Sequence, residues 1–156
     1  MSFFRRLAAI ATVLFAFGSA HAQVGVNQPQ PKLPTMLLQA GGHKIVAEIA
    51  ATGPTREVGM MLRTKMGKDE GMLFVFSELG YHAMWMKNTL LPLSVAFADQ
   101  KGVILSIHEM APQTEDNHQA AGPARYALEM NGGWFTANKV KVGDTIVGLE
   151  KAPKPQ

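Results

Sequence analysis

The sequence predicts a mainly β fold, a small closed or strongly curved β-barrel of six to eight short strands with one or two short helices. Apolar residues between positions 35 and 149 recur mostly at every second position, which is the period of a half-buried strand. Turn-forming residues separate these runs at short intervals. An open sheet of so many strands would leave exposed edges, which favours closure or strong curvature. The alternative is an α+β arrangement.

The first half of this region contains three predictable elements. Residues 36–51 alternate on both sides of a Gly-Gly pair, which predicts a hairpin. A threonine can then cap a short helix over residues 56–62. Residues 72–76 are apolar throughout, which predicts a strand buried on both faces.

The second half continues with short strands. The pattern predicts strands over residues 85–88, 93–98, 103–107, 125–130 and 145–149, a polar loop over 112–123 and one or two helical turns over 134–139.

The N-terminus has the features of a secretory signal peptide over residues 1–22. Two arginines precede an uncharged apolar run from Leu7 to Phe17, and Ala20-His21-Ala22 has the small-x-small pattern of a cleavage site after Ala22. The run is shorter than the roughly 20 residues that span a bilayer. An uncleaved membrane anchor is the alternative. We therefore expect a periplasmic or secreted protein of bacterial type, with no transmembrane span after cleavage.

The remaining chain divides into three parts. Residues 23–34 form a flexible Pro-rich arm, residues 35–149 a single β-rich domain and residues 150–156 a disordered tail. A domain of this length can bury a core without covalent staples.

Composition excludes several classes of function. Removal of residues 1–22 takes away two arginines and no acid, so the net charge falls from +3 to +1. No cluster of basic residues with interleaved aromatic residues remains, so we expect no nucleic-acid partner. The absence of cysteine excludes disulfides, thiolate metal sites and a cysteine nucleophile. We predict no cofactor.

Short motifs are distributed along the whole predicted domain. They are Gly59-Met-Met-x-Arg63, Glu70-Gly-Met-Leu-Phe-Val-Phe76, Trp85-Met-Lys-Asn-Thr89, Leu91-Pro-Leu93, Ile107-His-Glu109, Gly122-Pro123, Leu128-Glu129, Asn131-Gly-Gly133 and Gly143-Asp144. This set resembles an uncharacterised protein family, domain of unknown function 192. The resemblance covers residues 35–149 and implies a compact β-rich exported domain, without an assigned activity.

Lys87, Asn88 and Thr89 interrupt the most apolar part of the domain. As a ligand site, Lys87 would supply a point charge and Asn88 a paired donor and acceptor for an anionic or hydroxyl-rich molecule. In the structural alternative, Asn88 and Thr89 hold a turn and Lys87 extends to solvent.

Four further charged residues lie in apolar surroundings, namely Arg63, Glu70, Arg125 and Glu129, and all of these except Glu70 are candidate ligand contacts. Surface ion pairs are their alternative role. The first interpretation is therefore a non-enzymatic binding or envelope-associated module, whose partner is a small polar ligand or a component of the cell envelope.

Two other functions remain open. Glu109 and Glu129 on neighbouring strands could be the paired carboxylates of a small hydrolase that acts on envelope carbohydrate. His82, Met84 and Met86 alternate, so they could share a strand face and bind Cu(I). Core filling by the methionines is the alternative to copper binding.

Overall fold

The computed structural model describes residues 26–156, which form eight strands, two short α-helices and one 3-10 helix. The predicted signal peptide and its cleavage site lie outside the described residues. The elements are β1 (Thr35–Ala40), β2 (His43–Ala50), α1 (Gly53–Val58), β3 (Glu70–Gly80), β4 (Ala83–Met84), β5 (Leu93–Ala98), β6 (Ile104–Met110), β7 (His118–Gln119), β8 (Ala124–Asn131), α2 (Trp134–Ala137) and the 3-10 helix η1 (Leu149–Lys151).

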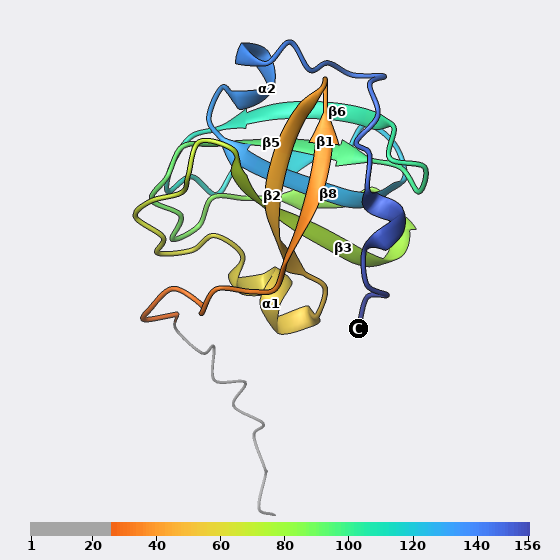
Figure 1. The fold of residues 1–156 in the computed structure, drawn as a ribbon. Helices are drawn as coiled ribbons and strands as arrows, with labels where there is room; N and C mark the ends of the chain where they lie inside the picture. Colours follow the sequence, from red (N-terminus) through yellow and green to blue (C-terminus); the bar gives the residue numbers. More distant parts are fainter. Residues whose placement is uncertain (1–25) are drawn as a thin grey trace, which may run out of the picture.

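Six strands form one sheet in the order β1-β2-β3-β8-β5-β6, and β4 pairs with β7 separately (Figure 1). All pairs in the large sheet are antiparallel except β2 with β3, which are parallel and connected through α1. The prediction of a mainly β fold with short helices is confirmed.

The large sheet is strongly curved around one hydrophobic core. Figure 1 shows β1 and β2 running across the remaining strands. This inner core takes buried side chains from every strand of the sheet, among them Leu38, Ile45, Leu73, Leu128, Ala96 and Ile104.

The outer strands β1 and β6 do not pair with each other along the large sheet. The chain after Asp144 partly fills the gap, because isolated bridges join Val103 to Thr145 and Gln39 to Val147. Strand pairing within residues 26–156 therefore leaves the sheet unclosed. The predicted strand over 145–149 is wrong: these two bridges and the start of η1 take its place.

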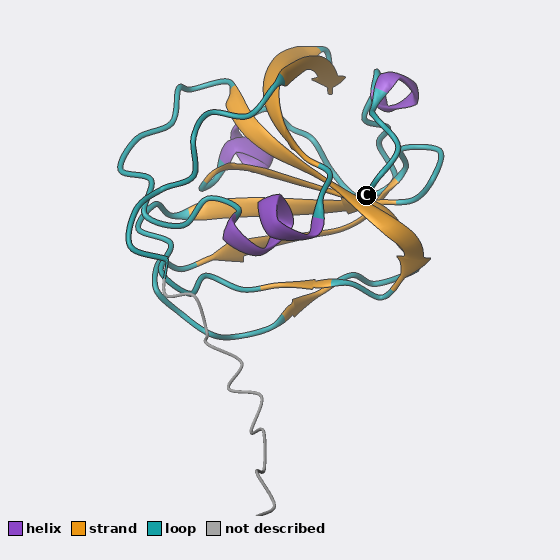
Figure 2. Cartoon of the chain, turned by 90° about the horizontal axis from the view of Figure 1, so that it is seen from below, coloured by secondary structure: helices purple, strands orange, loops and turns teal. Residues whose placement is uncertain are grey.

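A second core lies on the opposite face of the sheet. Its buried members include Phe74 of β3, Phe97 of β5 and Ala127 of β8. The turn after α1 adds Met60, and the segment that begins with β4 adds Met86. Figure 2 shows α1 lying across the strands. Because both faces of β3 and β5 are covered, the continuous apolar run over residues 72–76 forms a strand buried on both faces, as predicted.

The helix α1 begins earlier than predicted and ends earlier. Thr52 caps it by accepting a hydrogen bond from the Thr55 amide at 3.3 Å. Gly59, at φ 49°, then turns the chain away, so the predicted helix over 56–62 extends only to Val58.

The predicted strand over 85–88 is wrong, because these residues form a turn. Asn88 adopts φ 54°, which is the left-handed region, and the Thr89 amide donates to the Met86 carbonyl at 3.0 Å. The short strand β4 ends before this segment, at Met84.

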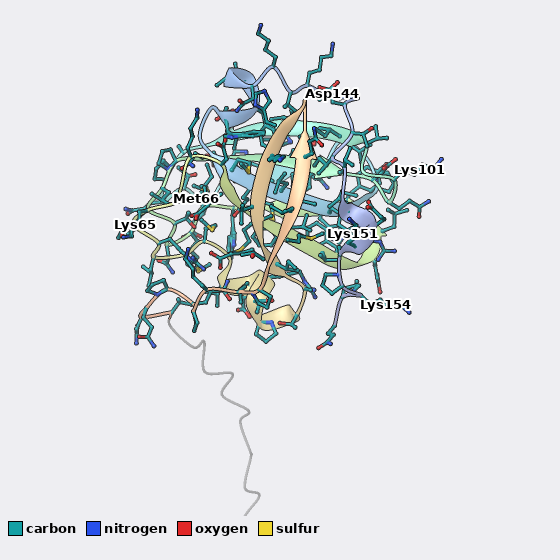
Figure 3. The ribbon with its side chains drawn as sticks, viewed as in Figure 1. Lys65, Met66, Lys101, Asp144, Lys151 and Lys154 are labelled. Carbon is teal, nitrogen blue, oxygen red and sulfur yellow. The ribbon has the colours of Figure 1, made fainter. Side chains whose placement is uncertain are left out.

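No helix within residues 26–156 is long and apolar enough to span a membrane. The exposed lysines are dispersed: Figure 3 shows Lys65 on one side of the molecule and Lys101 and Lys154 on the other.

Candidate functional site

Glu129 lies at the centre of the sheet with its carboxyl group inside the protein. Its β8 position pairs with Met72 of β3 and Val95 of β5, so apolar strands flank it on both sides. Only 3% of the residue is exposed, and its Oε2 atom makes no hydrogen bond to any part of the described chain. Burial raises the pKa of the carboxyl from 4.5 to about 8, because desolvation disfavours the ionised form. At neutral pH the group is therefore mainly a neutral acid, able to donate and accept.

Glu129 forms part of the wall of a cavity of about 270 Å³. Most of the lining is apolar. It comprises the aromatic residues Phe74, Phe76 and Trp85, the methionines Met60, Met61 and Met84, the small residues Gly59 and Ala83, and the polar residues Arg56, Glu57, Thr89 and Glu129.

Four chain segments converge on the cavity. Phe74 and Glu129 project from the same face of the sheet, because Phe74 pairs with Ala127, two residues before Glu129. The helix α1 supplies Arg56, and the turn after it supplies Met60. The segment from β4 to Thr89 completes the wall.

The donors of Arg56 are already occupied. Its guanidinium donates to the carbonyls of Ala51 at 2.7 Å, Val75 at 2.9 Å and Gln156 at 3.2 Å. Arg56 therefore ties α1 to the end of β2, to β3 and to the C-terminal residue, and it offers the cavity little free hydrogen-bonding capacity.

The Trp85–Thr89 motif is a tight turn at the rim of this cavity. Met86 is fully buried beneath it, and Thr89 is 4% exposed with its hydroxyl donating to the Lys87 carbonyl at 3.3 Å. The Asn88 carbonyl accepts from the Leu62 amide at 2.9 Å. Leu62 is itself in the left-handed region, at φ 60°. The turn therefore fixes Trp85 and Thr89 against the cavity.

The structure separates Lys87 and Asn88 from the cavity wall. Neither is among the lining residues. The Lys87 ammonium lies 5.3 Å from the centroid of the Trp85 ring. The Asn88 side chain makes no hydrogen bond to residues 26–156, so its place in the turn depends on backbone conformation, which Asn tolerates better than most residues.

The other predicted ligand contacts behave differently from one another. Arg63 forms a bidentate ion pair with Glu48. Both N–O distances are 2.8 Å, and both side chains are mostly buried. Arg125 donates to the carbonyls of Phe76 and Ser77 at 3.0 and 2.9 Å. Both arginines therefore have protein partners. Of the predicted set, only Thr89 and Glu129 line the same cavity.

The prediction that Glu109 and Glu129 form the carboxylate pair of a carbohydrate hydrolase is wrong. Glu109 pairs with Ser94 of β5, whereas Glu129 pairs with the next residue, Val95. Successive residues of a strand face opposite sides, so the two carboxyl groups lie on opposite faces of the sheet. Glu109 accepts from the Ser94 hydroxyl at 2.6 Å and the Gly133 amide at 2.9 Å. Two carboxyl groups on opposite faces cannot flank one glycosidic bond.

The strand face expected for copper ligands is also absent, because β4 contains only two residues. His82 stacks on Phe76 with ring centroids 3.7 Å apart, and its Nε2 is 2.9 Å from the Glu78 carbonyl oxygen. Met86 is buried in the core. Met84 instead lines the Glu129 cavity together with Met60 and Met61. Within residues 26–156, no group of three or more His, Asp or Glu residues is placed to hold a metal ion.

Three other hollows in residues 26–156 are larger. One, of about 550 Å³, is lined by Arg63 and Glu48, whose charges are paired with each other, although the Arg63 Nε atom has no hydrogen-bond partner. A second, of about 590 Å³, lies beside Trp134, and a third, of about 440 Å³, is lined mainly by residues 26–31. The Glu129 cavity is the smallest of the four, but none of the others is lined by a buried carboxyl oxygen without a partner. We therefore take the Glu129 cavity as the candidate site.

The comparisons with known proteins agree with the fold. A crystal structure from Sinorhizobium meliloti, described as a "putative transcription regulator", is 34% identical, covers 75% of this chain and 95% of its own, and superposes with a TM-score of 0.72. A protein of unknown function from Novosphingobium aromaticivorans is 31% identical, covers 73% and 85%, and has a TM-score of 0.71. A search of curated proteins found no match. The DUF192 family, described as "Uncharacterized ACR", matches residues 36–148. The chain therefore belongs to the DUF192 family, as its motifs predicted.

Proposed function

We propose that this protein is an exported binding module that takes one small ligand into the Glu129 cavity. One observation carries the proposal: the Oε2 atom of Glu129 is buried at the wall of a mainly apolar cavity without a hydrogen-bond partner from residues 26–156. A buried polar atom without a partner costs free energy. A ligand group that bonds to Glu129 would remove that cost. Mainly apolar walls with a few polar groups are typical of small-molecule sites.

Binding fits the cavity better than catalysis. A reaction would need a nucleophile or a second acid or base beside Glu129. The lining hydroxyl, Thr89, is engaged with the Lys87 carbonyl, and Glu109 lies on the other face. The signal-peptide features of residues 1–22 support export.

A thermal-shift screen of the purified protein against small organic molecules tests the proposal. A ligand at 100 times its Kd stabilises the folded state by about 2.7 kcal/mol. At a few degrees per kcal/mol, the melting temperature should rise by about 6 to 15 °C. Glu129→Gln should reduce this shift, whereas the control Glu109→Gln should retain it. Equal shifts in wild type and Glu129→Gln would place the ligand elsewhere and contradict the proposal.

Binding of Cu(I) is a second candidate, because three thioethers line the same cavity beside an indole. Met60, Met61 and Met84 are soft ligands of the kind that Cu(I) prefers. Titration of the protein with Cu(I) should then give a one-to-one complex with quenched Trp85 fluorescence, lost in Met84→Leu. Retention of the complex in Met84→Leu would exclude this ligand set.

The Sinorhizobium relative is described as a "putative transcription regulator". A regulator that binds DNA needs a basic surface. We do not extend that role to this chain, since its lysines are dispersed and its expected mature net charge is +1.

A further inference from the structure

We propose that the Glu129 cavity selects small organic ammonium ions, with the charged nitrogen against the Glu129 carboxylate and the apolar part against the aromatic rings. This inference rests on the binding function proposed above, and it names the class of ligand.

The charged residues of the cavity favour a cation. The lining holds two carboxyl groups, Glu129 at the buried wall and the exposed Glu57, and one guanidinium, Arg56. The guanidinium is committed to three backbone carbonyls. An ammonium ion would give Glu129 both a countercharge and hydrogen-bond donors.

An anion would find no positive charge free in this lining. The protonated Glu129 carboxyl could donate one hydrogen bond to it, but the hydroxyl of Thr89 already donates to the Lys87 carbonyl and the Arg56 guanidinium is committed to backbone carbonyls. The predicted anion site at Lys87 therefore lacks support from this cavity, since Lys87 does not line it.

The aromatic residues provide the second part of the argument. Cations bind over the faces of aromatic rings, and Trp is the strongest partner. Trp85 is 45% exposed, and it already accepts a cation, because the Lys87 ammonium lies 5.3 Å from its ring centroid. Phe74 and Phe76 line the same space. A carboxyl group surrounded by rings is a suitable environment for an alkylated ammonium.

Proton release accompanies such binding. The Glu129 pKa of about 8 means that ~90% of the carboxyl groups are protonated at pH 7. The ligand arrives as a cation, the carboxyl ionises to pair with it, and the proton passes to solvent. Other ionisable groups on this side of the sheet are Arg56 and Glu57 on α1 and two histidines. His108 pairs with Val95 on the same face of the sheet, and His118 pairs with Met84 and has its ring centroid 5.8 Å from that of His108.

Three probes of similar size separate the ligand classes: phenethylamine, its neutral analogue 2-phenylethanol and the anion phenylacetate. Isothermal titration of the purified protein at pH 7 should show phenethylamine binding at least tenfold more tightly than the other two. Titration in two buffers of different ionisation enthalpy should give release of ~0.9 proton per phenethylamine bound.

Two variants test the roles of the charges. Glu129→Gln keeps the shape of the side chain and removes its charge, so it should weaken phenethylamine binding tenfold or more and abolish proton release. Lys87→Met removes the lysine ammonium that competes for the Trp85 ring. Phenethylamine binding should therefore become about two- to fivefold tighter if the competing contact is worth ~0.5–1 kcal/mol. Glu109→Gln is the control and should leave binding unchanged.

The outcomes distinguish this inference from the binding function. Equal or tighter binding of 2-phenylethanol or phenylacetate, lost in Glu129→Gln, would overturn the ammonium class and retain the cavity as a binding site. Failure of all three probes to bind would overturn the ammonium inference, whether or not the broader screen finds a ligand. Phenethylamine binding that survives Glu129→Gln would overturn both.

Discussion

Replacement of Glu129 by glutamine should change how the stability of the protein depends on pH. The Glu129 pKa is about 8 in the folded protein against an ordinary value of 4.5. Between these values the folded state holds a proton that the unfolded state has released. Stability therefore falls as pH rises through this window, and the group contributes most to folding below pH 4.5.

The magnitude follows from the width of the window. Each pKa unit corresponds to about 1.4 kcal/mol, so ionisation of Glu129 lowers the free energy of unfolding by about 5 kcal/mol between pH 4.5 and pH 8. The amide introduced by Glu129→Gln would be neutral in both states and lose nothing. The variant should gain stability relative to wild type by about 1.4 kcal/mol per pH unit across this range. Burial of the amide adds a difference in the free energy of unfolding that does not depend on pH, so it does not change this slope.

Urea unfolding of both proteins at pH 5, 6, 7 and 8 measures the difference. Subtracting the two curves removes the contributions of groups that both proteins share. Thr89→Val is the matched control, because it alters the same cavity without removing a titrating group, and it should keep the wild-type pH dependence. A difference that stays constant from pH 5 to pH 8 would show that Glu129 is ionised in the folded state, and the reasoning about its burial would be refuted.

Three further predictions concern the turn, the ion pair and the N-terminus. Asn88→Gly should leave stability nearly unchanged in thermal unfolding. Asn88→Ala should lose about 1 kcal/mol or more, because alanine is disfavoured at φ 54°. Equal losses in the two variants would point to a role for the asparagine side chain. Arg63→Met should cost about 3 kcal/mol in urea unfolding, the low end for a buried pair, because Glu48 loses its countercharge and keeps only the Leu33 amide as a partner; a loss under about 1 kcal/mol would contradict this. Mass spectrometry of the exported protein should find Gln23 at its N-terminus; an intact Met1 in the membrane fraction would favour an anchor.

The fold class could be predicted because local pattern determines most strands here. The run over 72–76 is apolar at every position, and it forms the strand that both cores cover. The failures occurred where backbone conformation prevailed over composition. Residues 85–88 are apolar enough for a strand, but Asn88 turns the chain into the left-handed region. Residues 145–149 alternate like a strand, but Thr145 pairs with Val103 and Val147 pairs with Gln39 of β1. Because these partners belong to two different edges of the sheet, no continuous strand forms.

The site could be predicted only in part. Glu129 was a candidate because it is an acid within an alternating apolar strand, and the structure places it on the face opposite Leu128 and Met130, as that alternation required. The cavity around it depends on long-range packing: Met60 and Trp85 come from segments whose relation to β8 has no local signal. The same limit explains the Glu109 error, since a shift of one residue in register exchanges the two faces of a sheet.

Several unfavourable features of this fold lie close to the Glu129 cavity, which is an argument for function, although others, such as Lys139 at φ 57°, lie elsewhere. Leu62 holds a left-handed backbone that costs a non-glycine residue about 1–2 kcal/mol, and it is hydrogen-bonded to Asn88, which has the same conformation. Glu129 lies uncompensated among apolar residues at the wall beside this turn. A leucine at φ 60° and a buried carboxyl both oppose folding, and neither is needed to fill the core. Such costs persist at sites where they serve binding or reaction. The turn and the acid therefore belong to one site: the strained turn fixes Trp85 and Thr89, and these two residues line the same cavity as Glu129.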